Sequence, residues 1–145
     1  VDKDGSKKNP YIIHRTSIGC YERTLALLIE KYAGAFPTWL AFEQVAVVPV
    51  STEFDDYAKK VNDLLVSHDI RSNVYLGDEN MKAKIKNIST EHRTPYILVV
   101  GQNEKDSETV TCRYRFSSKK PQETFKLDDF VKYVEDKINT HFVGI

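Results

Sequence analysis

His14 and Arg23 are the first residues of this 145-residue chain whose types and spacing could do chemistry. The pattern of residues 11–17 predicts a β-strand that carries His14, and Arg23 falls in the first turn of the amphipathic helix that follows. A cation near a helix start opposes the helix dipole, at a cost of about 0.3–1 kcal/mol. A bound phosphate would remove this conflict, because free N–H groups and an arginine both bind phosphate. The pair therefore indicates part of a phosphate-binding active site, with a solvated arginine and a packed histidine as the ordinary alternatives.

Two arginines further along the chain indicate a second kind of site. Residues 110–116 alternate, so Val110, Cys112, Tyr114 and Phe116 should face the core of the protein. Thr111, Arg113 and Arg115 should then face the other way, with the two arginines about 6.8 Å apart along the strand. This spacing suits a single-stranded RNA loop, whose phosphates and base edges accept N–H donors. An exposed face with salt bridges to neighbouring acidic residues explains the pattern equally well.

The elements that must position these residues follow from the hydrophobic pattern. An apolar stripe predicts a helix that ends near Gly34, and Pro37 marks the connection to the rest of the chain. Strands are predicted at 45–50, 71–76, 96–100 and 110–116, and helices at 52–65, 80–90 and 127–138. This order predicts an α/β fold with a mixed sheet. Ligands of such sheets usually meet the loops at the carboxyl ends of parallel strands, which here hold Ser51, residues 77–80 and residues 101–107.

Composition places the chain in one globular class. With 41% hydrophobic and 29% charged residues, it can bury one core. No apolar run approaches the roughly 20 residues of a membrane span, so we expect a soluble protein of the cytoplasm or of an organellar matrix. A formal net charge of zero argues against binding through phosphates alone, but not against reading a few bases. The separated Cys20 and Cys112 indicate a reducing compartment, and the start at Val1 indicates a segment of a longer protein.

The residues around His14 and Arg23 form a pattern that is more specific than either residue alone. Ile13–Thr16, Gly19–Arg23 and Ala33–Ala41 resemble the third class II motif of threonyl-tRNA synthetases and the passage into their anticodon-binding domain. The resemblance continues through most of the chain. Its later landmarks are residues 45–49, 56–58, 70–71, 78–80, 84–85, 94–96, 99–101 and 110–115. The chain departs from the usual family pattern at Cys20, Thr24 and Phe42.

This resemblance implies specific roles for the first pair. Arg23 corresponds to the motif 3 arginine that holds ATP, and His14 corresponds to the third ligand of a zinc ion that selects threonine by its amino and hydroxyl groups. The parent enzyme would be a threonine–tRNA ligase that uses zinc and ATP with Mg²⁺, and a homodimer joined through its catalytic domain. In this family the other two zinc ligands lie upstream. We therefore expect the 145-residue chain to be monomeric, to bind no cofactor and to be inactive as a catalyst.

The same resemblance assigns residues to the anticodon. Arg115 corresponds to an arginine that reads the threonine anticodon, and Asp106 to a glutamate with the same task, although a small shift would give that role to Glu104 or Glu108. The complete predicted anticodon-binding set is Arg115, Arg113, Asp106, Lys84, Asp78 and Glu79. Lys82, Lys84 and Lys86 would form either a phosphate-facing edge or ordinary solvated surface.

The resemblance also divides the chain into two parts. Residues 1–41 would be the C-terminal end of a class II catalytic domain, and residues 42–145 a class IIa anticodon-binding domain with a mixed five-stranded sheet and about three helices. The implied partner is threonine tRNA, bound by its anticodon loop. The resemblance implies no contact with a membrane. Other interpretations stay open: a stand-alone RNA-binding module, and the same domain of a prolyl, histidyl or glycyl synthetase. A small-molecule-binding domain of the flavodoxin type is disfavoured, because the chain has no glycine-rich phosphate loop.

Overall fold

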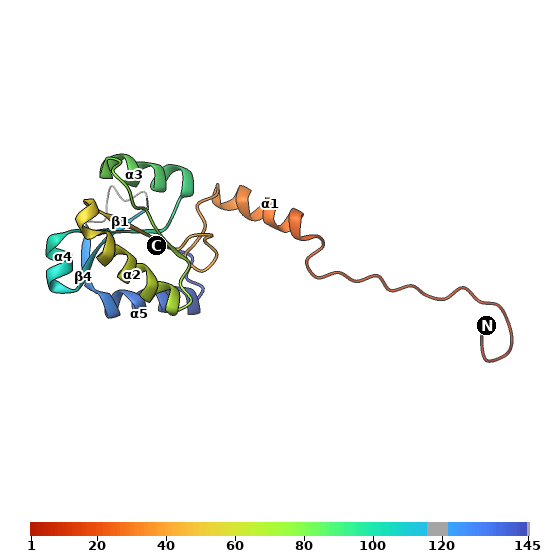
Figure 1. Ribbon diagram of the computed structural model, residues 1–145. Helices are drawn as coiled ribbons and strands as arrows, with labels where there is room; N and C mark the ends of the chain where they lie inside the picture. Colours follow the sequence, from red (N-terminus) through yellow and green to blue (C-terminus); the bar gives the residue numbers. More distant parts are fainter. Residues whose placement is uncertain (116–121, 145) are drawn as a thin grey trace.

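A five-stranded mixed sheet forms the centre of the protein, and the computed structural model describes residues 1–115 and 122–144 (Figure 1). The strands are β1 (Val45–Pro49), β2 (Ser72–Val74), β3 (Tyr96–Val100), β4 (Thr109–Tyr114) and β5 (Glu123–Lys126). Their order across the sheet is β2-β1-β3-β4-β5. The first three strands are parallel, whereas β4 and β5 are antiparallel to their neighbours. The predicted mixed five-stranded sheet is therefore confirmed.

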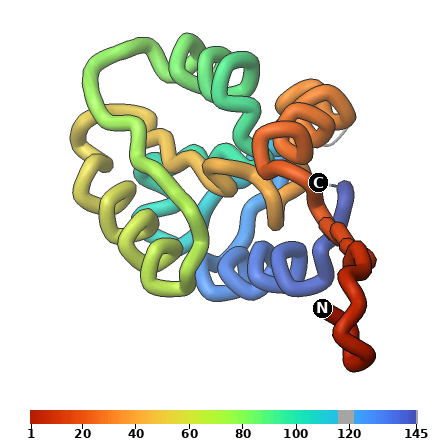
Figure 2. The backbone as a smooth tube through the Cα atoms, turned by 90° about the vertical axis from the view of Figure 1, so that its right-hand side faces the viewer, coloured from red at the N-terminus to blue at the C-terminus, as the bar shows by residue number. Residues whose placement is uncertain are grey.

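Helices cover both faces of this sheet, whereas the helix at residues 21–32 extends away from it (Figure 1). They are α1 (Tyr21–Tyr32), α2 (Asp55–Ser67) after the short 3-10 helix η1 (Thr52–Phe54), α3 (Met81–Asn87) continued by the π-helical turn η2 (Ile88–His92), α4 (Gln102–Ser107) and α5 (Leu127–Asn139). α2 and α5 lie side by side on one face, and α3 lies on the other (Figures 1 and 2). No helix in the described ranges is long and apolar enough to cross a membrane.

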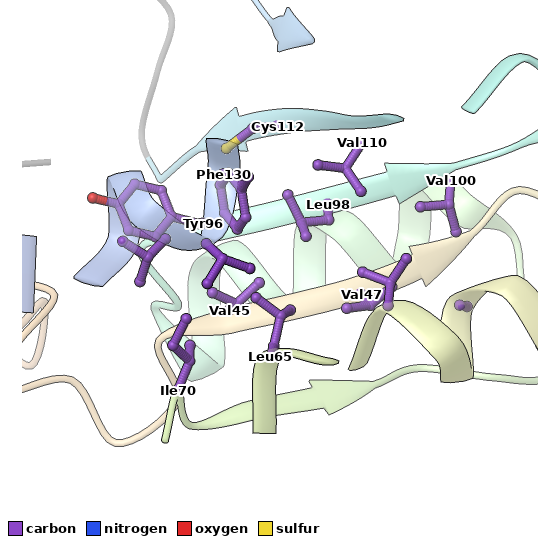
Figure 3. Packing of buried hydrophobic residues seen from close by; sticks show 14 of the residues in the cluster. Val45, Val47, Leu65, Ile70, Tyr96, Leu98, Val100, Val110, Cys112 and Phe130 are labelled. Carbon is purple, nitrogen blue, oxygen red and sulfur yellow. The ribbon is translucent and has the colours of Figure 1, made fainter. Parts of the chain in front are cut away.

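Two apolar clusters hold the helices on the sheet. The larger one joins α2 and α5 to the first face, with side chains such as Val45, Leu65, Leu98 and Phe130 (Figure 3). The smaller one joins Ile88 to the second face through Ala46, Val48 and Ile97. Because helices cover β1 on both sides, all of its residues are buried, which explains its continuous apolar sequence. Every strand and helix predicted from residue 45 onward is present, although residue 116 lies outside the described ranges.

The predicted strand at residues 11–17 is wrong. This segment forms no strand, and Tyr11, Ile12 and Ile13 are almost completely exposed. A strand needs a neighbour to pair its backbone N–H and C=O groups, and residues 1–10 supply a turn closed by Asp2 and Ser6 rather than a partner strand. The helix predicted after it does form as α1, which extends away from the sheet and buries none of its residues (Figure 1).

Candidate nucleic-acid interface

The second face of the sheet carries a row of polar side chains on β4 and β5. α3 and η2 cover this face over β1 and β3. Beside them Thr111 and Arg113 on β4 are half-buried and Thr124 on β5 is exposed, and we call these three residues the β4–β5 face. The opposite side chains of β4 lie in the core, since Val110 and Cys112 are fully buried. The predicted alternation of residues 110–114 is therefore confirmed, because one side of β4 packs under α5.

Glu104 places a carboxylate beside the β4–β5 face. Its Oε1 accepts a hydrogen bond from Thr111 Oγ1 at 2.7 Å, and its Oε2 accepts one from the N–H of Gly101 at 3.0 Å. A carboxylate can accept about four hydrogen bonds, so Glu104 keeps the capacity to bind a further donor. The sequence alone does not decide whether Glu104, Asp106 or Glu108 has the anticodon-reading role. The spacing Gly101-x-x-Glu104 is that of a capping box, in which the third residue of a helix accepts a hydrogen bond from the N-cap N–H. This spacing is the sequence signal that could have located Glu104 at the start of α4.

The other two acidic candidates lie differently. Asp106 is exposed on α4, and its Oδ1 accepts a hydrogen bond from Gln102 Nε2 at 2.8 Å. Glu108 forms an ion pair with Lys60 of α2 at 3.3 Å, which directs it toward the helix-covered side of the sheet. Of the three carboxylates, Glu104 is the one that is hydrogen-bonded to the β4–β5 face.

Arg113 presents its guanidinium on the same face as Thr111. It is half-buried and lies opposite Ile97 in the β3–β4 pairing. With the amide of Gln122 in the orientation that satisfies both side chains, the Gln122 oxygen accepts hydrogen bonds from Nε and Nη2 of Arg113. Gln122 is exposed and neutral, so a ligand with a better acceptor can displace it.

Arg115 does not lie on the exposed face, and the prediction that it does is wrong. Only 6% of its surface is exposed. Its Nη1 donates to the Arg93 carbonyl at 2.5 Å, and its Nη2 donates to the carbonyls of Ala35 and Phe36 at 3.1 and 2.9 Å. Its N–H still pairs with the Pro95 carbonyl beside β3, so the side chain is buried because the backbone of residues 35–36 and 93 covers its guanidinium. Burial, and secondarily the charge of Arg93, lowers the pKa of Arg115.

Lys84 is also turned inward. It is 6% exposed, and its Nζ donates to the carbonyls of Gly77 at 2.6 Å and Tyr75 at 3.1 Å. Lys82 and Lys86 remain exposed on α3. The prediction that all three lysines form one phosphate-facing edge is therefore wrong, because residues two apart on a helix point to nearly opposite sides.

Asp78 and Glu79 lie where the sequence placed them, at the carboxyl ends of the parallel strands. Both are exposed, and with Ser51 they line a hollow of about 200 Å³. Asn80 begins α3 by accepting a hydrogen bond from the N–H of Lys82 at 2.9 Å. The hollow also includes Val50, whose side chain would lie 3.2 Å from a Cβ on Gly101. Asp78, Glu79 and the start of α4 therefore belong to one edge of the sheet.

His14 and Arg23 are both exposed, His14 in the extended segment and Arg23 in the first turn of α1. Among residues 1–115 and 122–144, no three His, Cys, Asp or Glu side chains lie close enough together to hold a metal ion. The described residues alone therefore do not fit a zinc site.

Comparisons with known proteins show which family the chain resembles. The chain is 49% identical over 140 residues to the "Threonine--tRNA ligase" of Clostridium botulinum (strain Eklund 17B / Type B), which covers 97% of the chain and 21% of that relative. It is 40% identical over 138 residues to the protein of the same name from Thermoplasma acidophilum, covering 95% of the chain and 20% of the relative. The chain thus spans about a fifth of the length of these curated relatives.

A solved structure has the same fold. The crystal structure of the RNA binding domain of threonyl-tRNA synthetase from Cryptosporidium parvum Iowa II matches with a TM-score of 0.75 and 29% identity, over 79% of this chain and 28% of that one. A family profile described as "Anticodon binding domain" matches residues 44–137, which is more than half of the chain. The chain therefore belongs to the anticodon binding domain family.

Proposed function

We propose that this chain recognises the anticodon loop of threonine tRNA through the β4–β5 face and the adjoining edge of the sheet. The observation that carries the proposal is the position of Arg113 and Glu104. Glu104 contacts Thr111, and Thr111 and Arg113 share one face of β4, about 6.8 Å apart along the strand. A donor and an acceptor are thus presented on one face of the sheet. Asp78 and Glu79 lie at the carboxyl ends of the parallel strands, in a hollow that includes Val50 beside the start of α4.

The chemistry of an unpaired base suits this pair. A guanidinium donates two parallel hydrogen bonds to acceptors on a base edge, whereas a carboxylate accepts from base N–H groups. The bases of a single-stranded loop can be splayed out, so these edges are accessible. Because the chain has no net charge, such contacts rather than many phosphate contacts would supply the affinity.

We assign the predicted residues to two kinds of role. Arg113 takes the principal base contact that the resemblance gave to Arg115, since Arg115 is buried and bonded to backbone carbonyls. Asp78, Glu79 and Asp106 are exposed, and their carboxylates would accept hydrogen bonds from neighbouring nucleotides. Arg115 positions the backbone that follows β4, and Lys84 positions the loop between β2 and α3, instead of touching RNA.

We further propose that the chain acts as part of a longer threonine–tRNA ligase. Residues 1–41 would then complete a catalytic domain, Arg23 would bind ATP, and His14 would join zinc ligands from other parts of that protein. The exposure of apolar residues on α1 supports this assignment, because Leu25, Leu27 and Ile29 are about half exposed or more. The chain alone should show no threonine-dependent ATP–pyrophosphate exchange.

Binding of anticodon stem-loops tests the proposed function. The chain should bind the stem-loop of threonine tRNA more tightly than one of identical stem with an unrelated anticodon, and the middle and third anticodon bases should matter most. Fluorescence anisotropy at two salt concentrations measures both affinities and separates base contacts from phosphate contacts. Equal affinity for the two stem-loops would contradict the proposal.

A further inference from the structure

We propose that Arg93 and Arg115 form a clamp that fixes the orientation of α1 relative to the sheet. We call these two residues the arginine clamp. They act as positioning residues, because their side chains bind the protein backbone. The functional meaning of the clamp rests on the proposed function: it would hold the strand that reads the anticodon at a set distance from the helix that carries Arg23.

A continuous chain of hydrogen bonds runs from β4 to the end of α1. Arg115, which directly follows β4, donates to the carbonyls of Ala35 and Phe36 and to the carbonyl of Arg93. Arg93 in turn donates from its own Nη1 to the carbonyl of Ala33, which caps α1. The N–H of Arg115 is bonded to the carbonyl of Pro95 at 2.9 Å, which anchors the clamp to the start of β3.

The backbone at both ends of the clamp is constrained. Ala33 has φ 49° and Arg93 has φ 53°, so two residues with side chains adopt the left-handed conformation where they meet. Such residues persist only when surrounding contacts hold them. A Cβ on Gly34 would lie 3.6 Å from Arg93 Cδ, so the arginine stem packs directly against the helix end.

α1 makes few packing contacts with the rest of the described chain. None of its residues is buried, and the segment before it is exposed apart from the half-buried Ser6. The guanidinium of Arg115 is itself buried, and that burial lowers its pKa, so the group is positioned by the carbonyls rather than by solvent. Loss of either arginine should therefore free the helix without opening the sheet.

The orientation of α1 can be measured with two spin labels. Cys20 is exposed at the start of α1, whereas Cys112 is buried and should not react. A second label on D63C, at an exposed position of α2, completes the pair on the face away from the β4–β5 face. Double electron–electron resonance then reports the distance distribution between α1 and the sheet domain.

Arg71 provides the matched control. Its Nε and Nη2 also bind backbone carbonyls, those of Ala41 and Trp39, but nearer to β1. R93A and R115A should each broaden the distance distribution, and the double variant should add little because the two act as one unit. R71A should lower the melting temperature and leave the width unchanged.

The outcomes separate the clamp from a general loss of stability. Unchanged distance distributions in R93A and R115A, or equal broadening in R71A, would overturn the proposal. If R115A does not fold, the distance distribution of R93A alone tests the clamp. The affinity of R93A for the threonine anticodon stem-loop should stay within about twofold of the parent. If the parent chain binds no stem-loop while the clamp variants still broaden, the proposed function fails and the clamp stands as a structural joint.

Discussion

Two arginines of one strand region differ in role because their surroundings differ. Arg113 is half-buried on the β4–β5 face with an exposed glutamine as its neighbour. Arg115 follows two residues later, and its guanidinium is bonded to three backbone carbonyls. Residue type alone does not separate a ligand-binding arginine from a positioning one, whereas burial and hydrogen-bond partners do.

Replacing Arg115 with alanine should lower stability. The half-buried carbonyls of Ala35, Phe36 and Arg93 would lose a charged donor, and a lost hydrogen bond to a charged group typically costs about 1–3 kcal/mol. Urea denaturation followed by circular dichroism measures this change. Arg113→Ala serves as the control, since its partner Gln122 is exposed and should be solvated instead. Equal losses in the two variants would contradict the division of roles.

Three tyrosines predict a loss of stability at alkaline pH. Burial, as the largest cause, raises the pKa values of Tyr75, Tyr96 and Tyr114 above 10.0, and bonds from Tyr75 to Glu43 and from Tyr114 to Glu123 raise theirs further. The folded state favours the neutral phenols. Their contribution is therefore complete below the unfolded-state pKa near 10 and is lost as the pH rises above it.

Ultraviolet absorbance of tyrosinate measures this effect. After a rapid jump to alkaline pH, part of the tyrosine signal should appear only as the chain unfolds. Immediate ionisation of all eight tyrosines in a chain that is still folded would be the contrary result.

At the scale of elements, Lys84 shapes the loop between β2 and α3. Lys84→Met keeps the length of the side chain but removes the ammonium that binds the Tyr75 and Gly77 carbonyls. The variant should lose about 1–3 kcal/mol of stability. Hydrogen exchange at residues 77–80 should accelerate, and stem-loop affinity should fall. Lys86→Met, an exposed site on the same helix, should do neither, and identical exchange in the two variants would refute the role of Lys84.

The sequence predicts those helices and strands whose buried residues form a strongly apolar pattern. β1, β3, α2 and α5 could be located because their apolar patterns are continuous or have helical period. The sequence predicts a loop where α4 lies, since the six residues of α4 are all polar, and β5 is too short, at four residues, to show a pattern. The burial of Arg115 could not be predicted, because it depends on carbonyls 22, 79 and 80 residues away along the chain.

At the scale of the whole molecule, the fold should not depend on residues 1–32. This segment buries no side chain, and the clamp contacts begin only at Ala33. A chain that starts at Ala33 should therefore keep its melting temperature within a few degrees, as expected when less than about 1 kcal/mol is lost. Differential scanning calorimetry makes the comparison, and a large drop would show that α1 contributes to the core.

The central claim is that the β4–β5 face reads the anticodon, and the most direct test combines a protein change with an RNA change. Stem-loops that differ only at the middle or third anticodon base are titrated against the parent chain and against Arg113→Ala, with Lys132→Ala on α5 as an exposed control. Our account predicts that Arg113→Ala loses roughly 5- to 150-fold in affinity for the threonine stem-loop and discriminates less at one of these bases. An Arg113→Ala chain that discriminates as well as the parent chain would contradict it.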